Sequence, residues 1–111
     1  MKNYMSENPG LSEEAARYLA RKRVNAVAID CPSIDAGTDS KFTAHNILLP
    51  RNILVVENLC NLDRVASRRS SSSKSNRTNR TNNNITIFTL IISPLKLGGA
   101  TGSPARVLAL L

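Results

Sequence analysis

A run of serines, asparagines and arginines from Ser67 to Asn84 divides this chain and limits what can fold on either side of it. From Arg64 to Arg80 the sequence holds six basic residues and no acidic one, and it lacks an apolar period. Such low-complexity sequence cannot bury enough apolar surface to offset its chain entropy, so it predicts a disordered basic loop. We interpret the run as an insertion or as translated non-coding sequence, and the sequence alone leaves both open. The expected organisation is a first part over residues 1–66, the insertion over 67–84 and C-terminal strands over 85–111.

The same segment carries almost all of the excess positive charge. The chain has 15 basic and 8 acidic residues, and removing the six basic residues from Arg64 to Arg80 leaves 9 basic against 8 acidic. A high positive charge raises the hypothesis of nucleic-acid binding, but this loop has no aromatic side chain on which a base could stack. We therefore expect a solvated loop and do not expect nucleic acid as a partner. The alternative function is a non-enzymatic protein that binds nucleic acid or an acidic partner through this loop.

The rest of the composition predicts one small domain with few large side chains in its core. Of the 111 residues 41% are hydrophobic, but only 4% are aromatic and none is tryptophan, so stability should be marginal. No apolar run is long enough to cross a membrane as a helix, and residues 1–7 lack the apolar centre of a signal peptide. Cys31 and Cys60 have no Cys-x-x-C spacing, which argues against structural zinc. Since no secretory signal is visible, we expect reduced thiols in a cytoplasmic protein.

Local patterns predict alternating helices and strands, and hence an α/β fold. Ser12, followed by Glu13 and Glu14, is a good helix start, because its hydroxyl can cap the first turn and the carboxylates face the positive end of the helix dipole. The expected elements are a helix over 12–22, a strand over 26–30, a short helix over 43–49, a turn at 50–52, a buried strand over 53–56, and later strands over 85–92 and 106–111 joined by a glycine-rich connection at 97–104.

His45, the only histidine of the chain, and Glu57 are the best candidates for a metal site. Glu57 follows the apolar run 53–56, where an ionised carboxylate is costly unless it is paired, solvated or bound to a cation. Imidazole and carboxylate together suit zinc or manganese. On these residues alone, a satisfied histidine and a hydrated glutamate are the simpler interpretation. A catalytic metal site also needs about three protein ligands, so two candidates do not complete one.

Five sequence segments bear on the interpretation of His45 and Glu57. They are residues 9–16 (PGLSEEAA), 26–37 (AVAIDCPSIDAG), 42–45 (FTAH), 56–63 (VENLCNLD) and 94–106 (PLKLGGATGSPAR). Each is weak alone, but in order and spacing together they resemble the C-terminal half of the metal-dependent cyclase family, which includes bacterial kynurenine formamidases and isatin hydrolases. The resemblance covers residues 9–63 and 94–111.

The resemblance implies a partial swivelling β/β/α domain and two metal ligands. The histidine of the third segment and the glutamate of the fourth are ligands in the family, and here they are His45 and Glu57. Aspartate and serine side chains before a glycine often only stabilise turns, which is the default expectation for Asp30, Ser33 and Asp35. Because the family places this loop close to the metal, Asp30 is also a candidate for orienting a ligand.

For a complete enzyme, the resemblance implies hydrolysis of a small cyclic or N-formyl amide, as in the arylformamidases of tryptophan catabolism. Zinc or manganese would activate water, and a histidine would move protons. The family takes its other ligands from a His-x-x-x-His-x-Asp motif and uses a further histidine in catalysis, but this chain has no second histidine. We therefore expect the chain to be inactive alone, with no catalytic residue of its own. Association into a homo-oligomer fits the family, although identical chains would not supply the missing motif.

Overall fold

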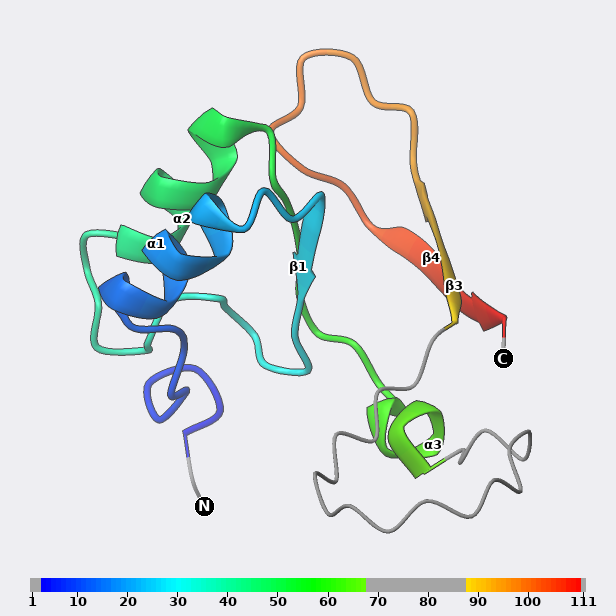
Figure 1. Cartoon of the computed structure of the whole chain (residues 1–111), viewed down its shortest axis with the longest axis horizontal. Coiled ribbons are helices and arrows are strands. Elements are labelled where there is room, and N and C mark those ends of the chain that lie inside the picture. The colour runs from blue at the N-terminus through cyan, green and yellow to red at the C-terminus, as the bar shows by residue number, and fades with distance from the viewer. Residues whose placement is uncertain (1–2, 68–87, 111) are drawn as a thin grey trace, which may run out of the picture. The chain divides into compact units, whose positions relative to one another are not determined.

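The computed structural model of the chain describes residues 3–67 and 88–110. The chain forms two compact units, Met1–Cys60 and Asn61–Leu111. The first contains α1 (Glu13–Arg21), β1 (Ala26–Ala28), α2 (Thr43–Leu48), the 3-10 helix η1 (Leu49–Arg51) and β2 (Leu54–Val56), and the second contains α3 (Leu62–Ser67), β3 (Thr89–Pro94) and β4 (Ala105–Leu110) (Figure 1). This mixture of helices and small sheets agrees with the predicted α/β class. No helix among the described residues is long and apolar enough to cross a membrane.

Helix α1 forms where the capping pattern predicted it. Ser12 Oγ accepts a hydrogen bond from Ala15 N at 3.2 Å, Glu13 and Glu14 lie in the first turn, and Arg21 lies in the last. A backbone N–H and the Ser12 hydroxyl both donate to the Glu14 carboxylate and lower its pKa, because they stabilise the ionised form. Each end of the helix dipole thus meets charge of the opposite sign.

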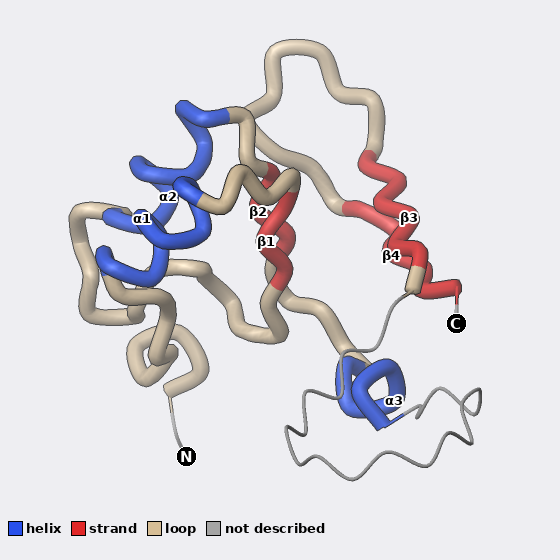
Figure 2. The backbone as a smooth tube through the Cα atoms, in the orientation of Figure 1, coloured by secondary structure: helices blue, strands red, loops and turns tan. Residues whose placement is uncertain are grey.

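Strands β1 and β2 form a two-stranded parallel sheet (Figure 2). The paired residues are Ala26 with Leu54, Val27 with Val55 and Ala28 with Val56. Asn58 N donates to Cys31 O at 2.9 Å, so the backbones still run together beyond the strands. Parallel strands bring their carboxyl ends to the same edge of a sheet, which is where binding sites are usually built. The loop after β1 and the residues after β2 therefore begin next to each other.

The core of the first unit joins both helices to this edge of the sheet. Its buried side chains are Ala16, Ile34, Ala44, Ile47, Leu48 and Ile53. Ile34 belongs to the loop after β1, so burial of its side chain ties that loop to α1 and α2. The core is small and uses no aromatic residue, in agreement with the composition.

The prediction that residues 53–56 form a fully buried strand is wrong for Leu54. Ile53 is buried and Val55 packs partly against the core, but Leu54 is 59% exposed. Successive side chains of a strand point to opposite faces of the sheet, so Leu54 points away from the face that holds Ile53 and Val55.

The second unit contains an antiparallel hairpin made by β3 and β4. The register runs from Thr89 opposite Leu110 to Pro94 opposite Ala105. Both strands were predicted, although residues 85–87 of the expected first strand lie outside the described residues. The glycine-rich segment makes the connection, as expected, and Gly99 adopts a φ of 72°, a conformation that glycine accepts without strain.

Helix α3 was not predicted from the sequence, which assigned residues 1–66 to the first part and residues 67–84 to the insertion. The helix runs from Leu62 to Ser67, with Asp63 in its first turn, where a carboxylate suits the helix dipole. Leu62 and Ala66 are good helix formers, and these local preferences prevail before the serine-rich run begins. The remainder of the predicted insertion, after Ser67, lies outside the described residues.

Candidate metal centre

The N-terminal segment holds the loop that follows β1. Asn8 Nδ2 donates to Asp35 O at 2.6 Å, and Asn8 O accepts from Gly37 N at 2.8 Å. Leu11 N donates to Ile34 O at 2.7 Å. Residues of the first sequence segment and its neighbour Asn8 are thus bonded to residues of the second, which explains why both segments occur together.

Gly10 permits this close approach. Its φ is +57°, and a Cβ added there would lie 2.0 Å from Ala36 N and 2.2 Å from the carbonyl carbon of Asp35. Such distances are far below van der Waals contact, so the position accepts only a residue without a side chain. The backbone of the loop is therefore fixed from one side before any side chain of the site is considered.

Asp35 connects this loop to α2. The side chain is buried, with 1% exposure for the residue, and Asp35 N donates to Ser33 Oγ at 3.1 Å. Asp35 Oδ1 accepts from Ala44 N in the first turn of α2, and Asp35 Oδ2 contacts Nδ1 of His45. Both carboxylate oxygens are thus engaged with residues of the short helix that carries the histidine.

Asp39 and Phe42 define how α2 begins. Asp39 Oδ2 accepts from Thr43 N at 3.0 Å and Asp39 Oδ1 accepts from Lys41 N at 2.8 Å. The Thr43 hydroxyl, followed by these backbone N–H groups, lowers the pKa of Asp39. Phe42 adopts a left-handed φ of 51°, and its ring lies edge-on to the His45 ring with centroids 6.2 Å apart. The start of α2 is therefore held by polar contacts rather than by helix propensity.

Glu57 reaches the same place from the end of β2. Its Oε1 accepts a hydrogen bond from Ile34 N at 2.7 Å. The same oxygen lies 3.4 Å from His45 Nε2, and both side chains are about a quarter exposed. The predicted path from α2 through η1 into β2 thus brings the two candidate ligands together.

The separation of these two atoms suits a shared metal ion better than a direct hydrogen bond. A charge-assisted N–H···O bond is about 2.7–2.9 Å long, which is shorter than the 3.4 Å between His45 Nε2 and Glu57 Oε1. Zinc bonds nitrogen and oxygen at about 2.0–2.2 Å, and a tetrahedral arrangement then separates two ligand atoms by roughly 3.3–3.5 Å. The residues present therefore fit a divalent metal as two of its ligands.

Two ligands do not make a complete catalytic site. Among the described residues, no group of three or more His, Cys, Asp and Glu side chains is placed to hold a metal ion. The carboxylate of Asp35 lies near the pair, but its oxygens are already bonded to Ala44 N and His45 Nδ1. The part of the chain that the structure describes thus brings two candidate ligands together, fewer than the three that a catalytic metal site needs.

Asp35, not Asp30, is the aspartate that contacts the histidine. Asp30 receives a contact from Cys31 Sγ at 3.8 Å, and the role predicted for it stays a prediction. Sequence reasoning assigned Asp35 only to a turn. The signal that could have identified it is its position, because it directly follows Ile34, which anchors the loop in the core, and its carboxylate contacts the helix of His45.

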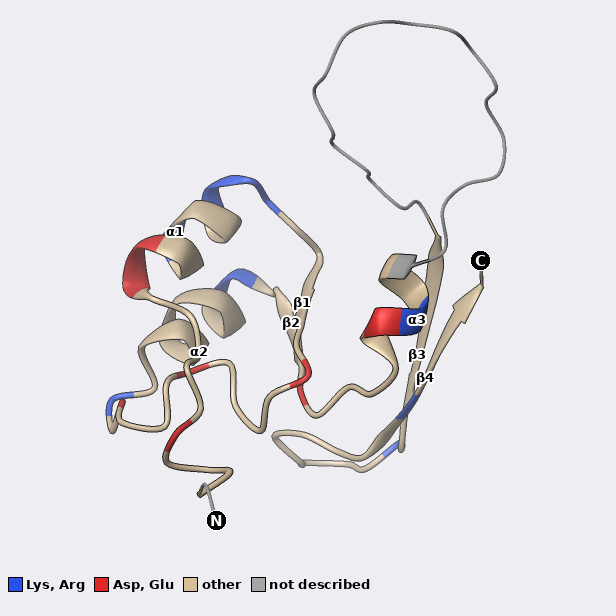
Figure 3. Cartoon of the chain, turned by 90° about the horizontal axis from the view of Figure 1, so that it is seen from below, with Lys and Arg blue, Asp and Glu red and all other residues tan. Residues whose placement is uncertain are grey.

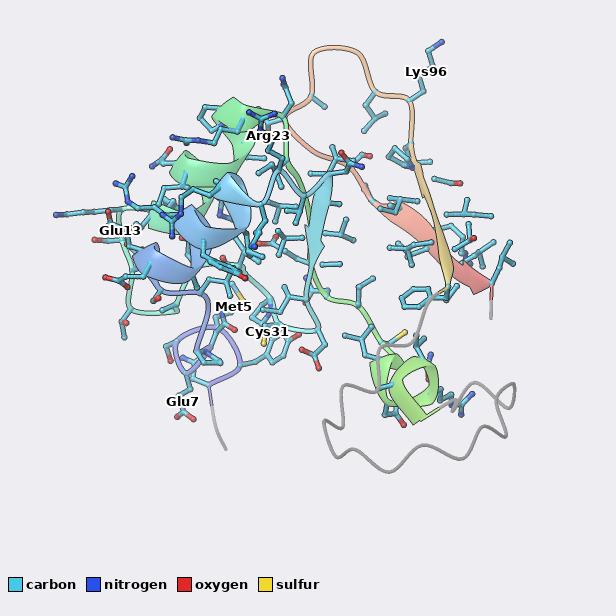
Figure 4. All side chains as sticks on the ribbon, in the orientation of Figure 1. Met5, Glu7, Glu13, Arg23, Cys31 and Lys96 are labelled. Carbon is cyan, nitrogen blue, oxygen red and sulfur yellow. The ribbon has the colours of Figure 1, made fainter. Side chains whose placement is uncertain are left out.

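A cavity of about 170 Å³ lies elsewhere on the first unit. It is lined by Arg17, Ala20, Arg21, Ile47 and Arg51. Figure 3 shows basic residues at the end of α1 and after α2, and acidic residues at the start of α1 and in the loops. Glu13 and Arg23, labelled in Figure 4, lie toward opposite ends of α1. Basic side chains near helix C-termini complement the dipole, so this cluster has a structural explanation.

Comparison with known proteins shows which proteins this chain is similar to. The family model described as putative cyclase matches residues 1–36. An isatin hydrolase from Roseibium aggregatum is 31% identical over 107 residues, covering 93% of this chain, and a kynurenine formamidase from Bacillus anthracis is 31% identical over 98 residues, covering 88%. A solved structure described as a potential metal-dependent hydrolase with cyclase activity aligns over 90% of this chain with a TM-score of 0.61 and 28% identity.

An α/β chain that brings an imidazole and a carboxylate to one sheet edge thus has metal-dependent hydrolases among its relatives. The chain is a relative of the cyclase family, and the resemblance predicted from the sequence is confirmed. It spans only 34% of the length of the isatin hydrolase, 38% of the kynurenine formamidase and 40% of the solved structure. The activity of those longer proteins is therefore not assigned to this chain.

Proposed function

We propose that this chain contributes two ligands, His45 Nε2 and Glu57 Oε1, to the divalent metal site of a cyclase-family hydrolase. The observation that carries the proposal is the 3.4 Å separation of these two atoms at the edge of the β1–β2 sheet. Glu57 is held for this role by Ile34 N. Zinc and manganese are the candidate metals, because both accept imidazole and carboxylate ligands.

The reaction proposed for a complete protein is hydrolysis of a small cyclic or N-formyl amide, of the kynurenine formamidase kind. A bound divalent metal would supply Lewis-acid activation of water. In this chain His45 and Glu57 hold the metal, and neither remains free to move protons during hydrolysis. Since the chain has no second histidine, we propose that it is inactive alone.

We also propose four features of the complete protein that the sequence led us to expect, which concern its fold, Asp30, its location in the cell and its self-association. The fold would be part of a swivelling β/β/α domain, with residues 1–66 and 85–111 as its segments and a basic insertion over 67–84. Asp30 would lie near the metal, the protein would be cytoplasmic, and self-association would fit the family. The non-enzymatic alternative, binding of nucleic acid or an acidic partner, depends on the insertion, and salt-sensitive RNA binding that disappears on its deletion would favour it.

Calorimetric titration of the chain with manganese tests the metal proposal. Manganese prefers oxygen and imidazole ligands over thiolates, so Cys31 and Cys60 compete little. We expect binding to the wild-type chain and its loss in His45→Ala and in Glu57→Gln, the latter keeping an oxygen for Ile34 N. Glu7→Gln is the matched control, because Glu7 points outward from the N-terminal segment (Figure 4). Equal binding by all four proteins would contradict the proposal.

Activity is tested separately with the zinc- and manganese-loaded chain. N-formylkynurenine and isatin serve as substrates, and product formation is followed by absorbance. We expect no metal-dependent hydrolysis above the rate of the free metal ion. Hydrolysis that requires His45 would contradict the proposal that the chain is inactive alone.

A further inference from the structure

We propose that Asp35 is a positioning residue that keeps the proton of the His45 ring on Nδ1 and so leaves Nε2 available to a metal. This inference rests on the proposed function, because a metal is what Nε2 would bind. The position of the ring hydrogen can nevertheless be tested without metal. Asp35 is 1% exposed, and one of its carboxylate oxygens contacts His45 Nδ1.

The surroundings of Asp35 leave its carboxylate little freedom. Its backbone is bonded on both sides, because Asn8 Nδ2 donates to Asp35 O at 2.6 Å and Asp35 N donates to Ser33 Oγ at 3.1 Å. Ile34, its neighbour, is fully buried in the core. Oδ1 is fixed by Ala44 N, so Oδ2 is directed at the histidine ring by the same helix turn that carries the ring.

The chemistry of the two groups then determines the tautomer. A carboxylate only accepts hydrogen bonds, and a neutral imidazole has one donor and one acceptor nitrogen. In the neutral ring, contact with Asp35 Oδ2 therefore requires that His45 Nδ1 carry the hydrogen, which leaves a lone pair on Nε2. That lone pair lies on the side of the ring that faces Glu57 Oε1, 3.4 Å away. Two electron-rich atoms face each other, and a cation between them relieves their repulsion.

A purely structural role for Asp35 explains only half of these contacts. Acceptance from Ala44 N would be explained if Asp35 only capped the start of α2. Capping alone would not explain why the second carboxylate oxygen contacts His45 Nδ1 and not solvent. Burying a carboxylate is costly, and a loop of polar residues could leave that oxygen in water. Carboxylates that hold the non-ligating nitrogen of a metal-bound histidine fix both its tautomer and its orientation.

Asp35→Asn separates the two roles because it keeps the shape of the side chain. An amide has one acceptor oxygen and one donor nitrogen. The Ala44 N–H still needs the oxygen, so the amide nitrogen faces His45 Nδ1, which must now accept. The ring hydrogen then moves to Nε2 and blocks the metal-binding lone pair. Glu7→Gln is the matched control, because it makes the same carboxylate-to-amide change at a residue that points outward from the N-terminal segment (Figure 4).

The first test is the tautomer of the metal-free wild-type chain, read from the ¹⁵N chemical shifts of the imidazole at mildly alkaline pH. The chain has a single histidine, so the two ring nitrogens need no further assignment to a residue. We expect the ring hydrogen on Nδ1 only, both in the wild type and in Glu7→Gln. Hydrogen on Nε2 in the wild type would overturn the inference whatever the variants do.

The second test compares Asp35→Asn with the two reference proteins. We expect its ring hydrogen on Nε2 and its manganese affinity lowered about 10- to 100-fold, with the fold retained by circular dichroism. An unchanged tautomer in a folded Asp35→Asn chain would overturn the inference. If the tautomers behave as expected but the wild type binds no metal, the proposed function fails and the assignment of Asp35 stands.

Discussion

Replacing Gly10 by alanine should lower the free energy of unfolding of the first unit more than a glycine-to-alanine substitution at the surface does. Gly10 has a φ of +57°, and a Cβ there would lie 2.0 Å from Ala36 N, 2.2 Å from the Asp35 carbonyl carbon and 2.6 Å from Ala36 Cα. All three neighbours are backbone atoms, so no side chain can rotate away. The loop must shift instead, and the bond from Leu11 N to Ile34 O at 2.7 Å lies directly beside it.

The expected cost has two parts. A left-handed backbone at a residue with a Cβ costs about 1–2 kcal/mol, and forcing an extra carbon into a packed position costs about 1–3 kcal/mol. Against them stands a gain of about 0.4–1 kcal/mol from the stiffer unfolded chain. The free energy of unfolding should therefore fall by roughly 1–5 kcal/mol, which is a large part of the stability of a small domain.

Urea denaturation followed by circular dichroism measures this loss. Gly98→Ala is the matched control, because a Cβ at Gly98 meets no atom within 4 Å and its φ is not positive. We expect its midpoint to stay within experimental error of the wild type or to rise slightly. Equal urea midpoints for Gly10→Ala and Gly98→Ala would mean that the N-terminal segment does not hold the loop of Asp35 in place.

Two further predictions concern the core and the start of α2. Leu48→Ala should lower the free energy of unfolding by about 2–5 kcal/mol because Leu48 is fully buried, and Leu54→Ala, at a side chain that is 59% exposed, should cost clearly less in the same urea titration. Hydrogen bonds lower the pKa of Asp39, so its stabilisation should be complete above the ordinary aspartate pKa of about 3.9 and should disappear as pH falls through the lower folded value. The difference in urea midpoint between wild type and Asp39→Asn should therefore shrink on acidification, and a constant difference would contradict this.

The local elements were predictable because local signals determine them. Ser12 followed by Glu13 and Glu14 set the start of α1 correctly, and the β-forming segments near the C-terminus formed the expected hairpin. The exposure of Leu54 was missed, because an apolar run does not reveal how many layers cover a strand. The short helix α3 was missed because the serine-rich composition downstream outweighed the helix formers at its beginning.

The two candidate ligands were chosen by resemblance, and their role stays a prediction, whereas the contact of Asp35 with the histidine was not anticipated. Family resemblance identified His45 and Glu57, and the structure brings their side chains within 3.4 Å. Asp35 could not be separated from Asp30 by sequence pattern, because both lie in the same polar loop. Their difference arises from tertiary packing, since burial of Ile34 turns the next side chain toward α2.

X-ray absorption at the zinc edge of the zinc-loaded chain identifies the side chains that bind the metal. Zinc could bind in this protein either to the His45–Glu57 pair or to the thiols of Cys31 and Cys60. We predict nitrogen and oxygen ligands at about 2.0–2.2 Å with one imidazole in the coordination sphere, and loss of the imidazole signal in His45→Ala. A zinc–sulfur distance of about 2.3 Å, unchanged by that substitution, would place the metal on cysteine and contradict the account.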